Sequence, residues 1–189
     1  MLKRKRITQS ILWMVILLLV SCVKDVDFDQ AENLTLTPVA AASIVYTSVE
    51  ASRFSENEIE LETVTDTISN IELFSDDFVL DHLVKAELIF ESTNTINRTF
   101  GLQIDFLSES DEQLHTLSFD ASPSLTGDEV ITTHTEIFED TSLEALKMTK
   151  NMVITLHLYS STDGSILDEN STGSIALKSR GNFYFNVSL

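Results

Sequence analysis

The sequence predicts an all-β protein: one antiparallel β-sandwich, immunoglobulin-like in broad architecture, with one or two short helices. Three observations lead to this fold class. From about residue 34 onward, apolar and polar side chains alternate with a period of two, as they do in a strand that buries one face. Threonine, valine, isoleucine and phenylalanine, which favour strands, are abundant. Short clusters of turn-forming residues separate the alternating runs.

The clearest strands are four alternating runs: Ala86–Phe90, Phe100–Phe106, Met152–Leu158 and Phe183–Val187. In each run the apolar residues occupy every second position, so they should share the face that is turned toward the interior. We therefore expect the following residues to lie inside one shared core: Phe90, Ile104, Phe106, Leu156 and Phe185.

Turn signals divide the chain into about eight to ten strands. Asn94–Asn97 and Ser108–Glu112 separate strands in the middle of the chain, and Asp163-Gly164 and Ser171–Gly173 interrupt its C-terminal third. Arg180-Gly181 is interpreted as the turn that joins the last two strands. Many short strands at this spacing are typical of a sandwich or a barrel. A β-barrel with a lipid-binding interior is therefore the alternative fold.

Two segments have helical character. Ser75–Leu83 could form one or two turns, with Ser75 as the N-cap and Phe78 facing inward. Thr141–Lys150 is the better helix, because Ser142 can cap its start, two leucines share one face, and lysines lie near its end.

The first 22 residues have the layout of a secretory signal peptide. Lys3–Arg6 carries four positive charges, and an unbroken apolar run of ten residues follows from Ile11 to Val20. Crossing a bilayer takes about 20 apolar residues, so a transmembrane helix is the weaker interpretation. The other alternative is a cleaved signal that leaves Cys22 as a free thiol, which is uncommon in an oxidising compartment.

Leu19–Cys22 resembles the lipobox of bacterial lipoproteins, which implies a diacylglyceryl group on Cys22, usually with a third chain on its amine. Such lipids anchor a protein stably, and the membrane is then the expected partner. Charged residues in Val23–Asp27 resemble the export signal of surface lipoproteins of the Bacteroidota, flavobacteria in particular; a solvated linker has the same composition. The resemblance implies an outer-membrane lipoprotein of the cell envelope, facing the periplasm or the surface.

The expected organisation is a signal peptide at residues 1–21, a lipidated acidic tether at 22–33 and a β-sandwich at 34–189. Removal of the signal leaves eight basic and thirty acidic residues, a formal net charge of −22. This charge repels nucleic acid, which we exclude as a partner. Cys22 is the only cysteine of the chain, so the sandwich contains no disulfide and its stability must come from an apolar core.

No residue is expected to bind a metal or a cofactor. Asp25, Asp27 and Asp29 open like a calcium loop, but an EF-hand also needs a glycine at its sixth position and a glutamate at its twelfth. The histidines lack the spacing of a zinc site and are His82, His115, His134 and His157. Calcium between loops is the weaker possibility left open, with Asp163, Asp168 and Glu169 as its best ligands.

No catalytic residue is expected either, and we predict that the protein is not an enzyme. The sequence holds no P-loop, no G-x-G-x-x-G and no G-x-S-x-G motif. Thirty acidic residues produce adjacent carboxylates by chance, so such pairs do not indicate a glycosidase. Asp66-Thr67-Ile68 resembles the O-glycosylation triplet of Bacteroidota envelope proteins.

Three functions remain. The first is a non-catalytic binding or scaffold lipoprotein with an envelope protein or a glycan as its partner. The second, the alternative, is a carbohydrate-binding accessory lipoprotein of a glycan-uptake system. Sugars stack on exposed aromatic side chains, and the mature chain has no tryptophan and only Tyr46, Tyr159 and Tyr184. An exposed aromatic platform would favour this function. The third is a hydrolase, which would require a deep pocket with converging histidines and acids.

Overall fold

The computed structural model describes residues 35–161 and 164–188, and Leu36–Val187 form one compact unit. The strands of the described residues are β1 (Thr35–Leu36), β2 (Val39–Glu50), β3 (Ser55–Glu56), β4 (Ile59–Glu60), β5 (Thr63–Ile68), β6 (Leu83–Asn94), β7 (Phe100–Leu107), β8 (Gln113–Ala121), β9 (Val130–Phe138), β10 (Asn151–Leu158), β11 (Ser174–Phe185) and β12 (Val187–Ser188). Its helical segments are η2 (Ala51–Phe54), η3 (Leu73–Ser75), α2 (Asp77–His82) and α3 (Asp140–Lys147).

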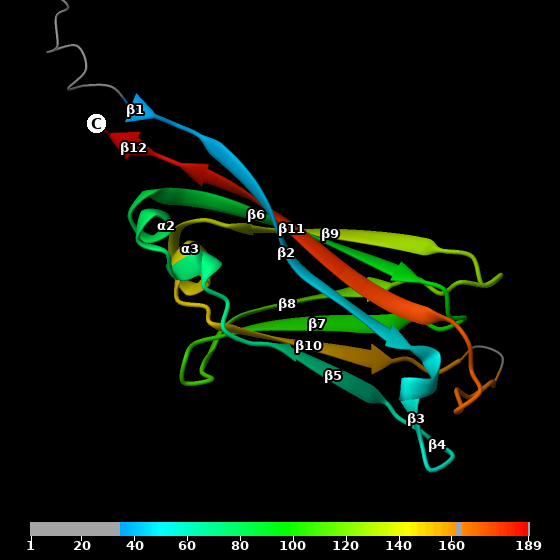
Figure 1. The fold of residues 1–189 in the computed structure, drawn as a ribbon. Coiled ribbons are helices and arrows are strands. Elements are labelled where there is room, and N and C mark those ends of the chain that lie inside the picture. Colours follow the sequence, from blue (N-terminus) through cyan, green and yellow to red (C-terminus); the bar gives the residue numbers. More distant parts are fainter. Residues whose placement is uncertain (1–34, 162–163, 189) are drawn as a thin grey trace, which may run out of the picture. The chain divides into compact units, whose positions relative to one another are not determined.

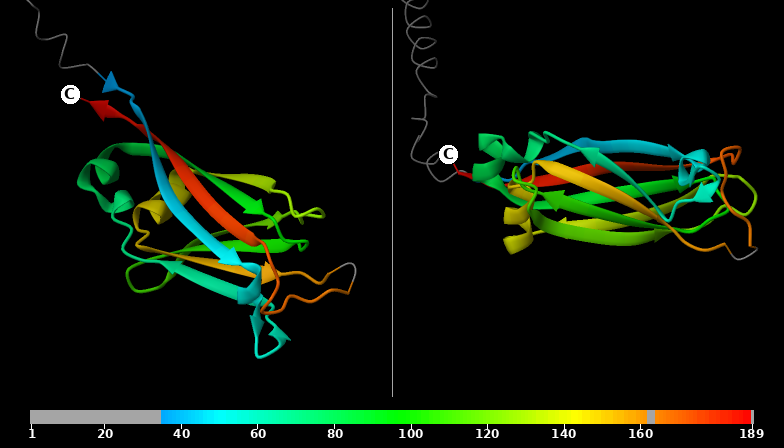
Figure 2. Two further views of the ribbon diagram at one scale, coloured as in Figure 1. Left: turned by 45° about the vertical axis from the view of Figure 1, so that its right-hand side comes forward. Right: turned by 90° about the horizontal axis from the view of Figure 1, so that it is seen from below.

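Two four-stranded antiparallel sheets form the two layers of a sandwich (Figures 1 and 2). One sheet has the order β2-β11-β6-β9 and the other has the order β5-β10-β7-β8. The predicted fold class, an all-β antiparallel sandwich with short helices, is confirmed. The alternative barrel is not what forms, because the two sheets have separate strand orders and side chains fill the space between them.

The strand pairs are nested along the chain. β7 and β8 form the innermost hairpin, β6 pairs with β9, β5 pairs with β10, and β2 pairs with β11. Successive pairs alternate between the two sheets. This is the order of a jelly roll, in which one long hairpin is rolled into a sandwich, and it differs from the order of an immunoglobulin domain. The sequence could not distinguish the two, because alternation marks the buried face of a strand and not its neighbour in the sheet.

Apolar side chains from both sheets form a single core. The five residues expected there, Phe90, Ile104, Phe106, Leu156 and Phe185, are all buried in it, so this prediction is confirmed. Phenylalanine dominates the centre of the core, where the fully buried rings are those of Phe54, Phe74, Phe90, Phe100, Phe106 and Phe138. The ring centroids of Phe106 and Phe138 lie 5.4 Å apart, and the rings meet edge to face, which is an arrangement that aromatic pairs prefer.

The turn expected at Arg180-Gly181 is wrong, because β11 runs without interruption through both residues. The irregularity lies in the neighbouring β2, where the register shifts beside Arg180 and Ile44 is the extra residue of a β-bulge. Gly181 is needed for packing, since a Cβ at this position would lie 2.4 Å from a ring atom of Phe183. The glycine therefore leaves room for an aromatic ring within a strand.

Helix α2 begins one residue later than expected and turns a different side chain inward. Its N-cap is Asp76, not Ser75, and the Asp76 carboxylate accepts a hydrogen bond of 3.0 Å from the Phe78 amide. Val79 is the buried residue, whereas Phe78 is half exposed and packs its ring 5.1 Å from that of Phe185. The expected inward position of Phe78 is therefore wrong.

Helix α3 forms within the expected segment, with Leu143 and Leu146 buried on one face. Its N-cap is Glu139, and Ser142 is the third residue of the helix. The Ser142 hydroxyl still caps the helix, because it accepts a hydrogen bond of 3.0 Å from the Glu139 amide. Sequence analysis identified the capping side chain and misplaced its position by one turn.

We predict that Phe106→Ala lowers the free energy of unfolding by about 3–5 kcal/mol, the usual cost of removing a buried phenylalanine ring. Asp105→Ala, one residue away on the outer face, removes hydrogen bonds to Gln103 and Thr116 at a partly exposed site. We expect it to cost about 1 kcal/mol. Urea unfolding of both variants measures the difference. Equal losses of unfolding free energy would mean that the residues of β7 that face the core are assigned wrongly.

Candidate functional site

Several predicted site residues lie outside the described residues. These are the lipidation site Cys22, the acidic tether with Asp25, Asp27 and Asp29, and Asp163. Within the described ranges, the structure contains no helix long and apolar enough to cross a membrane.

Asp168 and Asp128 accept hydrogen bonds within their own loops. The Asp168 carboxylate accepts hydrogen bonds of 2.9 Å from the Asn170 amide and 3.0 Å from the Ser171 hydroxyl. Asp128 accepts one of 2.8 Å from Thr126 within its own loop. The contact between the Asn170 amide and Asp168 is of the Asx type, which holds the backbone in a turn. No group of three or more histidine, cysteine, aspartate or glutamate residues in the described ranges is arranged to hold a metal ion.

Two of the histidines converge, although their spacing did not predict it. Glu136 on β9 lies 2.9 Å from His115 Nε2 on β8 and 3.2 Å from His134 Nε2 on its own strand. The His134 ring stacks on that of Phe119 with centroids 5.1 Å apart. β8 and β9 are the edge strands of different sheets, so this cluster joins the two layers along one side of the sandwich. Only the tertiary fold could place these residues together.

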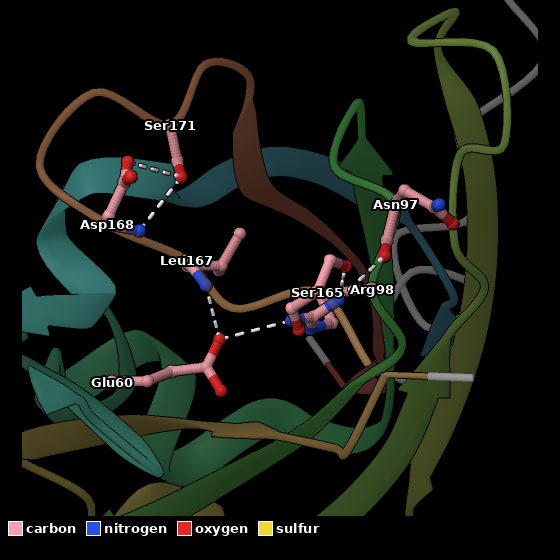
Figure 3. A network of polar contacts seen from close by, with 7 residues as sticks. All are labelled: Glu60, Asn97, Arg98, Ser165, Leu167, Asp168 and Ser171. Atoms are coloured by element: carbon pink, nitrogen blue, oxygen red, sulfur yellow. Dashed lines mark hydrogen bonds and ion pairs between the residues drawn. The ribbon is translucent and has the colours of Figure 1, made fainter. Parts of the chain in front are cut away.

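A buried arginine organises the loops at one end of the sandwich (Figure 3). Arg98, between β6 and β7, has a side chain only 2% exposed. Its guanidinium lies 3.2 Å from the Glu60 carboxylate and donates to the Ser165 hydroxyl at 2.8 Å and to the Ser165 carbonyl. The same Glu60 oxygen accepts a hydrogen bond of 2.5 Å from the Leu167 amide. Three segments far apart in the sequence are thereby fixed to one another.

This network is structural rather than a ligand site. The terminal nitrogens of Arg98 are engaged by Glu60, Ser165 and the Asn97 carbonyl, so none is directed toward solvent as an open donor. An adjacent hollow of about 400 Å³ is lined by Glu60–Thr63 and His157–Ser160. The arginine holds the loop between β10 and β11 in place, and no residue signal in the sequence predicted that role.

Two of the three tyrosines are committed to contacts within the protein. The Tyr159 hydroxyl donates to Asp120 at 3.1 Å, and its ring covers Gly101, where a Cβ would lie 2.6 Å from the hydroxyl. The hydrogen bond to Asp120 raises the pKa of Tyr159 above its ordinary value. Tyr159 therefore packs against its own sheet rather than standing free as a platform.

Tyr184 is held in the same way on the other sheet. Its hydroxyl donates to Glu87 at 2.9 Å, and the Lys85 ammonium lies 5.2 Å from its ring centroid. Lys85 and Glu87 also form an ion pair of 2.7 Å. Their hydrogen bond lowers the pKa of Glu87 and raises that of Lys85, and the bond to Glu87 raises the pKa of Tyr184.

Tyr46 is the exception. It lies on the outer face of the β2-β11-β6-β9 sheet, is 75% exposed, and has no hydrogen-bond or ring partner among the described residues. Two hollows flank it, one of about 370 Å³ and one of about 310 Å³, and both are also lined by Glu91 and Lys178. Lys178 is the cross-strand partner of both Tyr46 and Glu91 and forms an ion pair of 2.6 Å with Glu91. We call this area, centred on Tyr46, Glu91, Lys178 and Arg180, the Tyr46 face.

Comparisons with known proteins add no functional assignment. No family model matches the chain, and no curated protein matches it. A protein of Parabacteroides distasonis classed as secreted is 15% identical, with 62% of this chain and 36% of that chain covered and a TM-score of 0.43. T=1 particles derived from infectious bursal virus give 14% identity, 80% and 36% coverage and a TM-score of 0.41. The enzymatically active domain of tailspike protein 4 of bacteriophage CBA120 is 12% identical. The match covers 82% of this chain and 20% of that chain, with a TM-score of 0.33.

The chain thus spans about a third or less of each of these three structures. At these identities and scores the similarities carry no functional argument. The assignment of a jelly roll rests on the strand order of this chain.

We predict that Arg98→Ala lowers the free energy of unfolding by about 2–3 kcal/mol. Breaking a buried ion pair by removing one partner costs about 3–5 kcal/mol, and Glu60, with a side chain 27% exposed, regains some hydration. Hydrogen exchange at the Leu167 amide should accelerate, because its acceptor is no longer fixed. Arg53→Ala, at an exposed arginine, is the control and should change stability by less than about 0.5 kcal/mol. Equal effects of the two substitutions would contradict the organising role of Arg98.

Proposed function

We propose that this chain is a lipoprotein of the cell envelope, anchored in the outer membrane through a lipid on Cys22, whose sandwich acts as a non-catalytic binding module. The Leu19–Cys22 segment after a ten-residue apolar run supports the anchor. A single core of side chains from both sheets supports a rigid scaffold. Binding then takes place on the outer surface, and the Tyr46 face is the surface best suited to it.

A glycan is the ligand that the Tyr46 face fits best. The main support is the state of Tyr46. Alone of the three tyrosines, it makes no ring contact and no hydroxyl hydrogen bond with any described residue. An exposed aromatic ring offers an apolar surface to the C–H face of a sugar and a polar hydroxyl at its edge. The hollows of about 370 and 310 Å³ are within the lower range of small-ligand sites, about 300–1,000 Å³.

The polar residues around Tyr46 favour a sugar over a protein partner. A stable protein interface buries about 800 Å² on each side. On this sheet it would cover the ion pairs of Lys178 with Glu91 and of Lys85 with Glu87. Removing such pairs from water is costly. A sugar, in contrast, can hydrogen-bond to the same groups through its hydroxyls while they stay partly hydrated.

The same residues favour binding over hydrolysis. Glu91 and Glu129 both line the smaller hollow, and a glycosidase needs two carboxyl groups that act as a pair across the scissile bond. The Glu91 carboxylate is already engaged by Lys178 at 2.6 Å. Because Lys178 holds this carboxylate in place, we expect Glu91 to serve as a fixed contact for sugar hydroxyls, and the module to release its glycan unchanged.

The anchor is tested by Cys22→Ala. Wild-type protein expressed with a fatty-acid analogue should incorporate the label and fractionate with membranes, because Cys22 supplies the only thiol of the chain. The variant should lose the label and leave the membrane fraction. Equal labelling of both proteins would end the lipoprotein proposal.

Glycan binding is tested with full-length protein, purified in detergent, on an array of neutral and acidic oligosaccharides. Tyr46→Ala should weaken binding to every bound glycan by about tenfold or more, since the stacking surface is lost. Tyr159→Ala removes another exposed tyrosine from the opposite sheet and should leave binding unchanged. Absence of any bound glycan, or equal effects of the two substitutions, would refute glycan binding by the Tyr46 face.

A further inference from the structure

We infer that the sugar bound at the Tyr46 face is acidic, and that Arg180 holds its carboxylate. This inference rests on the proposed glycan binding and adds the chemical class of the ligand: an oligosaccharide that contains a uronic acid.

The first observation is that Arg180 has no partner. Four of the seven lysines and arginines in the described ranges pair with a glutamate: Lys85 with Glu87, Arg98 with Glu60, Lys147 with Glu144 and Lys178 with Glu91. Arg180 is exposed and makes no side-chain hydrogen bond or ion pair with any residue in the described ranges. An arginine that no carboxylate of the described residues engages is available for an external anion.

The second observation is the position of this arginine. Arg180 and Tyr46 line the same hollow of about 370 Å³, together with Ser43 and Ile89. On a sheet, diagonal neighbours lie about 7–8 Å apart, which is comparable to the distance across a sugar ring and its carboxylate. A uronic acid can therefore stack on Tyr46 while its carboxylate reaches the Arg180 guanidinium.

The β-bulge sets this arrangement. Tyr46 is opposite Lys178, but the extra residue Ile44 makes Ser43 the partner of Arg180. Bulges bend a strand and redirect its side chains, and they are frequent beside functional sites. Here the bulge lies between the two residues that contact the ring and the carboxylate.

Charge complementarity selects arginine as the anion-binding group. The planar guanidinium donates two parallel hydrogen bonds to a carboxylate, and such charge-assisted bonds are about twice as strong as neutral ones. The net negative charge of the protein opposes an anion only at long range. At 0.15 M salt, charges beyond about 8 Å are largely screened, so the nearby Arg180 determines the preference. Lys178 is already neutralised by Glu91 and contributes hydrogen bonds to hydroxyls.

The test compares each acidic oligosaccharide with its neutral counterpart. Galacturonate, glucuronate and mannuronate trisaccharides, and the same three with carboxyl groups reduced to alcohols, are titrated calorimetrically into the full-length protein in detergent at 0.15 M salt. Wild-type protein should bind at least one acid at least tenfold more tightly than its reduced counterpart. Arg180→Gln should bring that ratio close to one, because it weakens binding of the acid far more than binding of the neutral sugar.

Arg53→Gln is the matched control, because it removes an exposed arginine that lines neither hollow. It should keep the preference for the acid, whereas an equal loss in both variants would attribute the preference to net charge and overturn the role of Arg180. Equal wild-type affinities for acid and neutral sugars would refute the acidic ligand and leave glycan binding intact. Failure of all six sugars to bind would refute the acidic ligand, whereas binding of other glycans on the array would leave the proposed function standing. Circular dichroism confirms that each variant is folded.

Discussion

The structure depends on the insertion of β11 between β2 and β6. β11 pairs with both strands over almost its whole length, so β2 has no place in the sheet until the last long strand arrives. The inward residues of β11 also complete the core, and its outward residues include Lys178 and Arg180. The Tyr46 face therefore exists only when segments more than a hundred residues apart, β2 and β11, are paired. Such long-range pairing is slow to form because the loop must close before any contact stabilises it.

Local chemistry explains which parts of this fold could be read from the sequence. Alternation predicted the strands and the buried residues Phe90, Ile104 and Phe106, because burial on one face follows directly from the pleat. It did not predict the strand order, which depends on contacts between distant segments. Arg180-Gly181 was misinterpreted because glycine serves both turns and close packing, and only the neighbouring Phe183 ring distinguishes the two. The N-caps of the helices were misplaced by one to three residues, since several neighbouring side chains can accept a hydrogen bond from the first backbone amides of a helix.

The candidate site was still less accessible to sequence analysis. All three tyrosines of the chain look equivalent in the sequence, and their roles differ only through tertiary neighbours. Asp120 and Glu87 each engage one of them, whereas Tyr46 has no such neighbour among the described residues. The same holds for the arginines. Arg98 is held by Glu60 and Ser165, while Arg180 projects from an open sheet. Arginine thus links segments of the chain at one end of the sandwich, and on its face it presents an unpaired positive charge among the described residues.

The bulge at Ile44 also protects the molecule against unwanted association. β2 ends the order of its sheet, and a strand of twelve residues with a free edge is a template for pairing with another chain. A register break bends and twists that edge, so a second strand can align with only part of it. A strand of a second copy could otherwise pair along this edge and extend the sheet. The irregularity beside Tyr46 and Arg180 is thereby also a feature that disfavours pairing along the edge of β2.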